Sequence, residues 1–171
     1  RDGSDIFHQP RHVAERIVVD FLQDIAMAAP GHDQIGHVDM PAANGSTASG
    51  FECYPAVPGR TWHQESFYFA RLLAGGMQSI GAKLRGRGGV RYIYYLENDQ
   101  KQLVENTYTQ VRNERSFTLL EDVDCPAVLA EQCFVTNAED VERFGSEEGC
   151  KTVARIYYEA ICAYFGTEPH W

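Results

Sequence analysis

The pattern of apolar and polar positions along the chain predicts alternating helices and strands. Apolar residues spaced three and four positions apart predict long helices at Arg11–Met27, Gln64–Leu84 and Ser146–Phe165. Short runs rich in aromatic and β-branched residues predict strands. These runs are Ser49–Tyr54, Tyr92–Leu96, Ser116–Leu120 and the segment that follows Cys125. Because helices separate the strands, we expect an α/β fold with a mostly parallel twisted sheet flanked by helices.

The segment Cys125–Asp140 carries the clearest candidate for chemistry. Pro126 is followed by four apolar residues and then by Glu131, which predicts a buried strand ending at a carboxylate. Open α/β sheets place ligand sites at the carboxyl ends of their strands. An ionised carboxylate is expensive to bury without a partner. Glu131 is therefore a candidate functional residue, although the spacing equally allows a solvated strand end.

The helix expected at Ser146–Phe165 has favourable signals at both ends. Glu147 and Glu148 complement the helix dipole at the first turn, and Gly166 stands where a C-terminal cap belongs. Its apolar positions fall on one face, which we expect to pack on the sheet that carries Glu131. These positions are Val153, Ile156, Tyr157, Ala160, Ile161 and Tyr164.

Length and charge limit the classes of function. The 171 residues suffice for one domain with a core, and a net charge of −9 argues against nucleic acid or anionic lipid as the main partner. The basic stretch at 85–89 (RGRGG) is accordingly interpreted as a loop. The chain has no apolar run of membrane-spanning length. It also starts without methionine, which indicates processing or a piece of a longer protein.

Histidine and cysteine residues are the other candidates. The composition of Ala28–Ser49 predicts a long loop that contains His32, His37 and Asp39, and loops of this length are uncommon unless they are functional. The five cysteines lack the spacing of a zinc site or of a disulfide framework. Cys133, two residues after Glu131, is the one cysteine close to a candidate catalytic group.

Two blocks of sequence resemble the zinc-dependent N-acetylmuramoyl-L-alanine amidases of the Amidase_3 type. PAVLAEQCFVTNAEDVERF resembles the strand P-A-V-L-V-E, which in that family leads into G-F-[IL]-[ST]-N and an acidic helix start. GHVDMPAANGSTASGFECY resembles the family's S-I-H-A-N segment, its small-residue loop and the following G-x-E-x-Y strand. The resemblance covers roughly residues 36–165 and is most specific around Glu131.

The resemblance implies a function and roles for two residues. His37 would be the second zinc-ligating histidine and Glu131 the catalytic glutamate of a peptidoglycan amidase, with Zn²⁺ as cofactor. The expected reaction is hydrolysis of the bond between N-acetylmuramic acid and L-alanine of the stem peptide. Peptidoglycan or a muropeptide would be the substrate. The enzyme would act in the cell envelope or outside the cell, or it would be a phage lysin. We expect a monomer and a single amidase-like domain over residues 1–171, with its N-terminal part truncated or divergent.

The sequence departs from the family at the first zinc ligands. The family's G-H-G-G strand end and the helix with a glutamate ligand are not recognisable. His8 with Glu15 preserves the order of ligands, His32 is a second candidate, and residues before Arg1 are a third possibility. A catalytically inactive module of the same ancestry, which binds the cell wall or acts as an interaction module, therefore stays open as an alternative. A thiol hydrolase that uses Cys133 with His37 is a weaker one.

Overall fold

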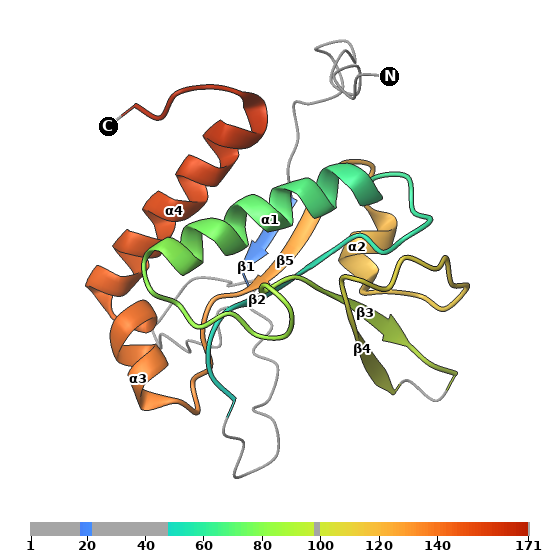
Figure 1. Cartoon of the computed structure of the whole chain (residues 1–171), viewed down its shortest axis with the longest axis horizontal. Coiled ribbons are helices and arrows are strands. Elements are labelled where there is room, and N and C mark those ends of the chain that lie inside the picture. The colour runs from blue at the N-terminus through green and yellow to red at the C-terminus, as the bar shows by residue number, and fades with distance from the viewer. Residues whose placement is uncertain (1–17, 22–47, 98–99, 171) are drawn as a thin grey trace, which may run out of the picture.

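The computed structural model describes residues 18–21, 48–97 and 100–170. Figure 1 shows how the helices and strands are arranged. In chain order they are β1 (Val18–Phe21), β2 (Glu52–Pro55), α1 (His63–Ser79), β3 (Arg91–Tyr95), β4 (Lys101–Glu105), α2 (Thr118–Asp122), β5 (Ala127–Glu131), α3 (Ala138–Asp140), a π-helical turn (Val141–Gly145) and α4 (Glu147–Phe165).

The described strands form one mixed three-stranded sheet and one antiparallel hairpin. β5 lies in the middle of the sheet, with β1 parallel to it on one side and β2 antiparallel on the other. β3 and β4 pair with each other as antiparallel strands. The mostly parallel sheet expected from the sequence is therefore wrong for this part of the chain. Alternating helices and strands give the order of the elements but not the direction of the strands. In addition, the polar sequence of β4 did not indicate a strand, so the β3–β4 hairpin was not predicted. Its short connection requires antiparallel pairing.

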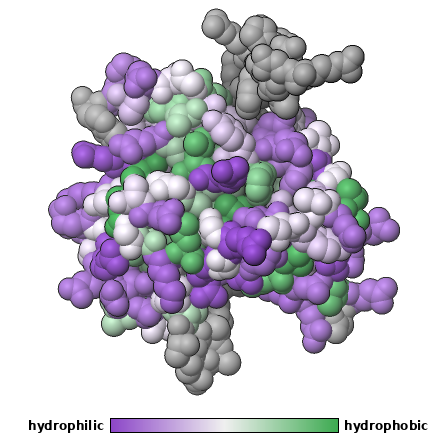
Figure 2. Space-filling model, viewed as in Figure 1, coloured by the Kyte–Doolittle hydropathy of each residue, from purple (hydrophilic) through white to green (hydrophobic). Residues whose placement is uncertain are grey.

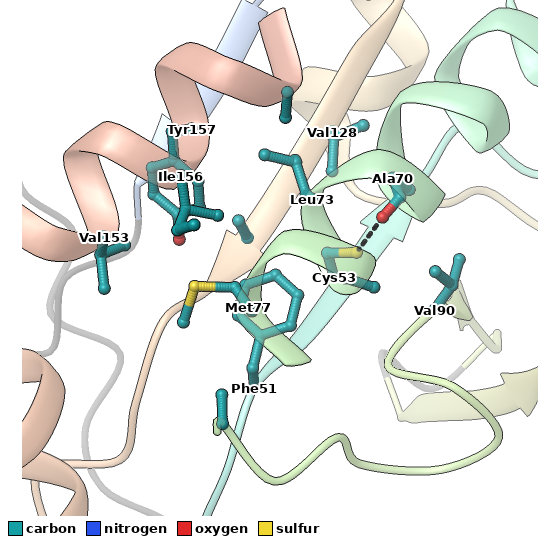
Figure 3. Close-up of a cluster of buried hydrophobic side chains, with 14 of the residues drawn as sticks. Phe51, Cys53, Ala70, Leu73, Met77, Val90, Val128, Val153, Ile156 and Tyr157 are labelled. Atoms are coloured by element: carbon teal, nitrogen blue, oxygen red, sulfur yellow. Dashed lines mark hydrogen bonds between the residues drawn. The ribbon is translucent and has the colours of Figure 1, made fainter. Parts of the chain in front are cut away.

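One face of the sheet is covered by α1 and α4, which lie side by side in Figure 1. Val128 and Ala130 of β5 and Cys53 of β2 point into this core, together with apolar side chains of both helices. Figure 3 shows Phe51, which directly precedes β2, lying near Met77 of α1 and Ile156 of α4 in this core. The fit is close, since a Cβ at Gly76 of α1 would lie 2.5 Å from Cγ2 of Ile156.

A smaller core forms on the opposite face of the sheet. Tyr54 of β2 and Leu129 of β5 point to this side and pack with Ile93 of β3 and Leu120 of α2. The two cores fix which side chains of β2 and β5 face the helices and which face away. Glu52 and Glu131 belong to the second group, because side chains alternate along a strand.

Two elements differ from the sequence prediction. The helix expected at Arg11–Met27 is a strand at Val18–Phe21, where two valines pair in parallel with β5; the rest of that range lies outside the described residues. The strand expected at Ser116–Leu120 is instead the short helix α2. Glu121 fixes that helix by accepting hydrogen bonds from Arg60 and from the Ser116 backbone N–H. In both places tertiary contacts override local preference.

The two long helices of the C-terminal two-thirds are confirmed. α1 ends at Ser79, five residues before the expected end, because Gly81 adopts a φ of 82° and redirects the chain toward β2. α4 begins after Ser146, whose side chain accepts from the Gly149 N–H, and ends at Gly166 with a φ of 65°. Ser146 and Gly166 are standard N-terminal and C-terminal helix caps.

The outer surface is largely polar. Figure 2 shows hydrophilic side chains over most of the visible face, with small green patches between them. Within the described ranges, none of the helices has the length and apolar character needed to cross a membrane. All five cysteines are free thiols, and four of them are buried.

The packing of α4 leads to a stability prediction. Ile156 is 6% exposed within the helix-covered core, so Ile156→Ala should lower the free energy of unfolding by about 2–5 kcal/mol. Thr152→Ala, at an exposed position one turn away on α4, should change it by less than about 0.5 kcal/mol. Urea denaturation of the two variants measures the difference. Equal stabilities would contradict the assignment of the buried face.

Candidate active site

The candidate site is built on the pairing of β2 with β5. In the antiparallel register Glu52 lies directly opposite Glu131, and Tyr54 lies opposite Leu129. Directly opposed residues of antiparallel strands project to the same face, so both glutamates point away from the α1–α4 layer. Like charges in this position repel each other, so the pair requires compensation by cations or by a proton.

Glu52 is compensated by two arginines. Its side chain is only 2% exposed, and its two carboxylate oxygens accept from Arg85 Nε and Arg91 Nη1, each at 2.8 Å. A buried carboxylate with a guanidinium on each oxygen is stabilised as an ion. Glu52 is thus held in place as a fixed negative charge beside Glu131.

Backbone hydrogen bonds set the position of Arg85. The N–H of Phe51 donates to the carbonyl of Lys83 at 2.7 Å, and the N–H of Arg85 donates to the carbonyl of Phe51 at 2.9 Å. The segment after α1 therefore runs alongside the start of β2. Farther along β2, Cys53 donates to the carbonyl of Gly89, so the same segment then leads into β3 and Arg91. Both arginines reach Glu52 because the chain returns along β2.

The start of β2 is anchored from the other direction. The Gly50 N–H donates to Oδ2 of Asp140, a buried carboxylate at the end of α3, at 2.6 Å. Asp140 is positioned in turn by the side chain of Asn137, which caps α3 by accepting from the Asp140 N–H. The polar segment after β5 therefore anchors the start of β2, the strand that pairs with β5.

The side-chain pKa of Glu131 is strongly raised. Burial, then the negative charge of Glu52 and a hydrogen bond between the two carboxyl groups, raise the pKa of Glu131 from 4.5 to about 8, while Arg85 and Lys101 act in the opposite direction. Burial and the charges of Glu131 and Glu52 also raise the pKa of Tyr54.

A carboxyl group in this state suits proton transfer near neutral pH. General acid–base catalysis is most efficient when the pKa of the group lies near the working pH. A strongly shifted pKa caused by burial and a specific neighbouring charge is a frequent property of active sites. The Glu131 carboxyl can therefore both accept and donate a proton under ordinary conditions.

The structure tests the position of only some predicted site residues. Glu131 ends β5, where the sequence placed it. His37, His32, His8 and Glu15 all lie outside the described residues, so their roles stay predictions. The part of the chain that the structure describes contains no cluster of three or more His, Cys, Asp or Glu side chains suited to a metal ion. Cys133 is buried, at 6% exposure, in the helix-covered core.

Sequence reasoning missed three residues of the site. Glu52 enters the sequence prediction only within a strand motif, Arg85 enters it only within a basic loop, and Arg91 does not enter it. Two signals pointed to them: a charged residue within the otherwise apolar run FECY, and a basic segment in an acidic chain. Neither signal says which cation meets which anion, because that depends on the path of the chain after α1.

The sequence of the chain also matches a known protein family. The family described as N-acetylmuramoyl-L-alanine amidase, Amidase_3, matches residues 37–163. The chain belongs to this family of amidases. No curated protein matches the chain.

Solved amidase structures show a similar fold at low identity. N-acetylmuramoyl-L-alanine amidase from Clostridium difficile 630 is 18% identical with a TM-score of 0.51, over 76% of this chain and 55% of that one. The CwlD amidase from Clostridioides difficile, solved in complex with the GerS lipoprotein, is 17% identical with a TM-score of 0.50, over 74% and 51%. Apo Ami1 from Mycobacterium abscessus is 23% identical with a TM-score of 0.48, over 68% and 48%. The chain thus spans about half the length of these amidases.

The paired glutamates lead to a prediction about acidity. In the metal-free protein, Glu52→Gln should lower the pKa of Glu131 from about 8 toward the ordinary value of a glutamate. The neutral amide removes the like charge and leaves the positive charges of Arg85 and Lys101 to act on Glu131. Titration of the glutamate side-chain carboxyls by ¹³C NMR measures this change.

Glu148→Gln provides the matched control for that titration. Glu148 is exposed in the first turn of α4, so its replacement should leave the pKa of Glu131 unchanged. A pKa that stays near 8 in Glu52→Gln would show that burial alone shifts Glu131 and would remove Glu52 from the account.

Proposed function

We propose that the chain is a zinc-dependent peptidoglycan amidase that hydrolyses the bond between N-acetylmuramic acid and L-alanine of the stem peptide. Its membership of the amidase family supports the reaction class. The observation that carries the proposal is the raised pKa of the Glu131 carboxyl. This group lies at the end of β5, and burial and Glu52 raise its pKa to about 8. Peptidoglycan as substrate places the proposed activity in the cell envelope or outside the cell.

Glu131 is the proposed proton carrier of the reaction. Amide hydrolysis requires removal of a proton from the attacking water and delivery of a proton to the leaving nitrogen. One carboxyl group can perform both transfers in sequence when its pKa lies between those of the two partners. Glu52 supports this role by fixing the orientation of Glu131 across the strand pair, since the side chain of Glu52 is itself fixed by Arg85 and Arg91.

The proposal assigns zinc binding to residues outside the described part of the chain. His37 would be one ligand, with His8 and Glu15, or His32, as candidates for the others. When bound, zinc supplies a Lewis acid for the amide carbonyl and makes water nucleophilic near neutral pH.

Replacement of Glu131 tests the proposed mechanism. Glu131→Gln keeps the size and polarity of the side chain but removes the proton acceptor, so the rate of peptidoglycan hydrolysis should fall by roughly 10²–10⁴-fold. Folding, measured by circular dichroism, and zinc content, measured by elemental analysis, should not change.

The control for Glu131 is Glu139→Gln, at an exposed position in α3, which should hydrolyse at the parental rate. If Glu131→Gln also hydrolyses at the parental rate, Glu131 has no part in the mechanism. If the parental protein binds peptidoglycan and does not hydrolyse it with zinc present, the inactive wall-binding module is the correct description.

Replacement of His37 tests the proposed metal ligand. His37→Ala should abolish zinc binding and hydrolysis together, since one imidazole of a tetrahedral site is lost. His32→Ala, five residues away, should leave both properties nearly unchanged. Zinc content measured after dialysis against zinc-free buffer distinguishes the two variants. Loss of zinc from His32→Ala but not from His37→Ala would reverse the assignment of the two histidines.

A further inference from the structure

A pocket of about 300 Å³ lies beside the paired glutamates, and its lining is cationic. It is lined by Ser49, Lys83, Leu84, Arg85, Gly86 and Arg91. Three of these six residues carry a positive charge, although the chain as a whole has a net charge of −9. A concentration of one sign of charge in a hollow attracts ligands of the opposite sign.

The charges around the pocket do not cancel. Glu52 is buried behind Arg85 and Arg91 and balances one of them. The partly exposed Glu105 lies 3.5 Å from Arg91 Nε and also accepts from the backbone N–H of Arg87. Lys83 is exposed, and its ammonium contacts the hydroxyl of Ser49 at 3.4 Å rather than a carboxylate. Lys83 therefore supplies a positive charge that forms no ion pair with a carboxylate among the described residues.

Hydrogen-bond donors also remain for a ligand. Each guanidinium has five N–H donors. Arg85 directs Nε to Glu52 and Nη1 to the Ser49 carbonyl, and Arg91 directs one Nη to Glu52. These bonds use part of each fork, and the remaining donors belong to side chains that line the pocket. Arginine forks and a lysine ammonium together are suited to a carboxylate or a phosphate.

The pocket is joined directly to the candidate catalytic group. Arg85 and Arg91 contact the pocket on one side and Glu52 on the other, and Glu52 faces Glu131 across the strand pair. The guanidinium of Arg85 also lies 4.6 Å over the ring of Phe134, three residues after Glu131. An anion in the pocket would therefore lie against the two arginines that also contact Glu52, the residue paired with Glu131. It would belong to the same substrate molecule that reacts at Glu131.

We propose that this cationic pocket, formed by Lys83, Arg85 and Arg91, binds a free carboxylate of the peptide attached to the scissile amide. The inference rests on the proposed function, because it takes the substrate to be the lactyl–alanine bond of peptidoglycan. The stem peptide carries a carboxylate on the residue that follows the alanine, one peptide unit from the scissile bond. Lys83 and the two arginines bind that carboxylate and thereby select the acidic form of the peptide over its amide.

The experiment compares two probes that differ by one charge. These are N-acetylmuramoyl-L-alanyl-D-glutamate with a free α-carboxylate, and the same compound with that carboxylate amidated. Isothermal titration calorimetry with the metal-free full chain should show binding of the acid at least tenfold tighter than binding of the amide. The preference should shrink as salt is added, because exposed charge pairs are screened. Shifts of the backbone amide NMR signals of Ser49 and Gly86 should locate the acid in the pocket.

Lys83→Gln removes the exposed charge without breaking a buried contact. The preference for the acid should fall by about tenfold in this variant, and Lys83→Arg should restore most of it. Lys151→Gln is the matched control, since Lys151 is an exposed lysine on α4 that pairs with Glu147 and Glu148 and does not line the pocket. Its preference should equal that of the parental chain.

The outcomes separate this inference from the proposed function. Hydrolysis of acid and amide with equal KM, or a preference that survives Lys83→Gln, would overturn the carboxylate pocket and leave the amidase intact. Binding of glycerol phosphate but not of the acid would reassign the pocket to the phosphate of a wall polymer and overturn it as well. Binding and hydrolysis of neither muramoyl probe by the zinc-loaded chain would overturn both proposals.

Discussion

The burial of Glu52 opposite Glu131 is the interaction on which the rest of the site depends. Two carboxyl groups in a directly opposed cross-strand pair are unfavourable unless charge is neutralised. The structure resolves the conflict asymmetrically, since Arg85 and Arg91 form ion pairs with Glu52, whereas burial and the charge of Glu52 raise the pKa of Glu131. The asymmetry requires that β2 pairs with β5 in one register and that both arginines lie against β2. A one-residue slip of β2 would turn Glu52 into the apolar core under α1 and α4.

The sequence predicted the parts of the fold that local periodicity determines. The amphipathic helices α1 and α4, the cap at Gly166 and the buried strand that ends at Glu131 depend on nearest neighbours along the chain, and the structure contains all four features. The direction of β2 and the hairpin of β3 with β4 depend on pairing between distant residues. So does the helix at Thr118–Asp122, which is fixed by Arg60 across the fold. Hydrophobic periodicity and the local propensities of residues do not indicate which distant residues pair.

The candidate site divides in the same way. Glu131 could be predicted because a carboxylate at a strand end has a local signature and because its surroundings resemble a known family. Its acidity could not, since that property comes from Glu52, 79 positions earlier in the sequence, and from burial in the folded chain. Of the two arginines that fix Glu52, only Arg85 was visible in the sequence, as part of a basic loop. The Lys83–Phe51–Arg85 backbone bonds, which place this loop against β2, appear only in three dimensions.

Arg85 and Arg91 serve two groups at once, because they hold Glu52 and line the cationic pocket. An anion that binds there would lie beside Arg85, whose positive charge opposes protonation of Glu131. Occupancy of the pocket and protonation of Glu131 are therefore thermodynamically linked, and each raises the affinity for the other by the same factor. The site would then respond to its ligand through a shift in proton affinity, without any movement of the backbone.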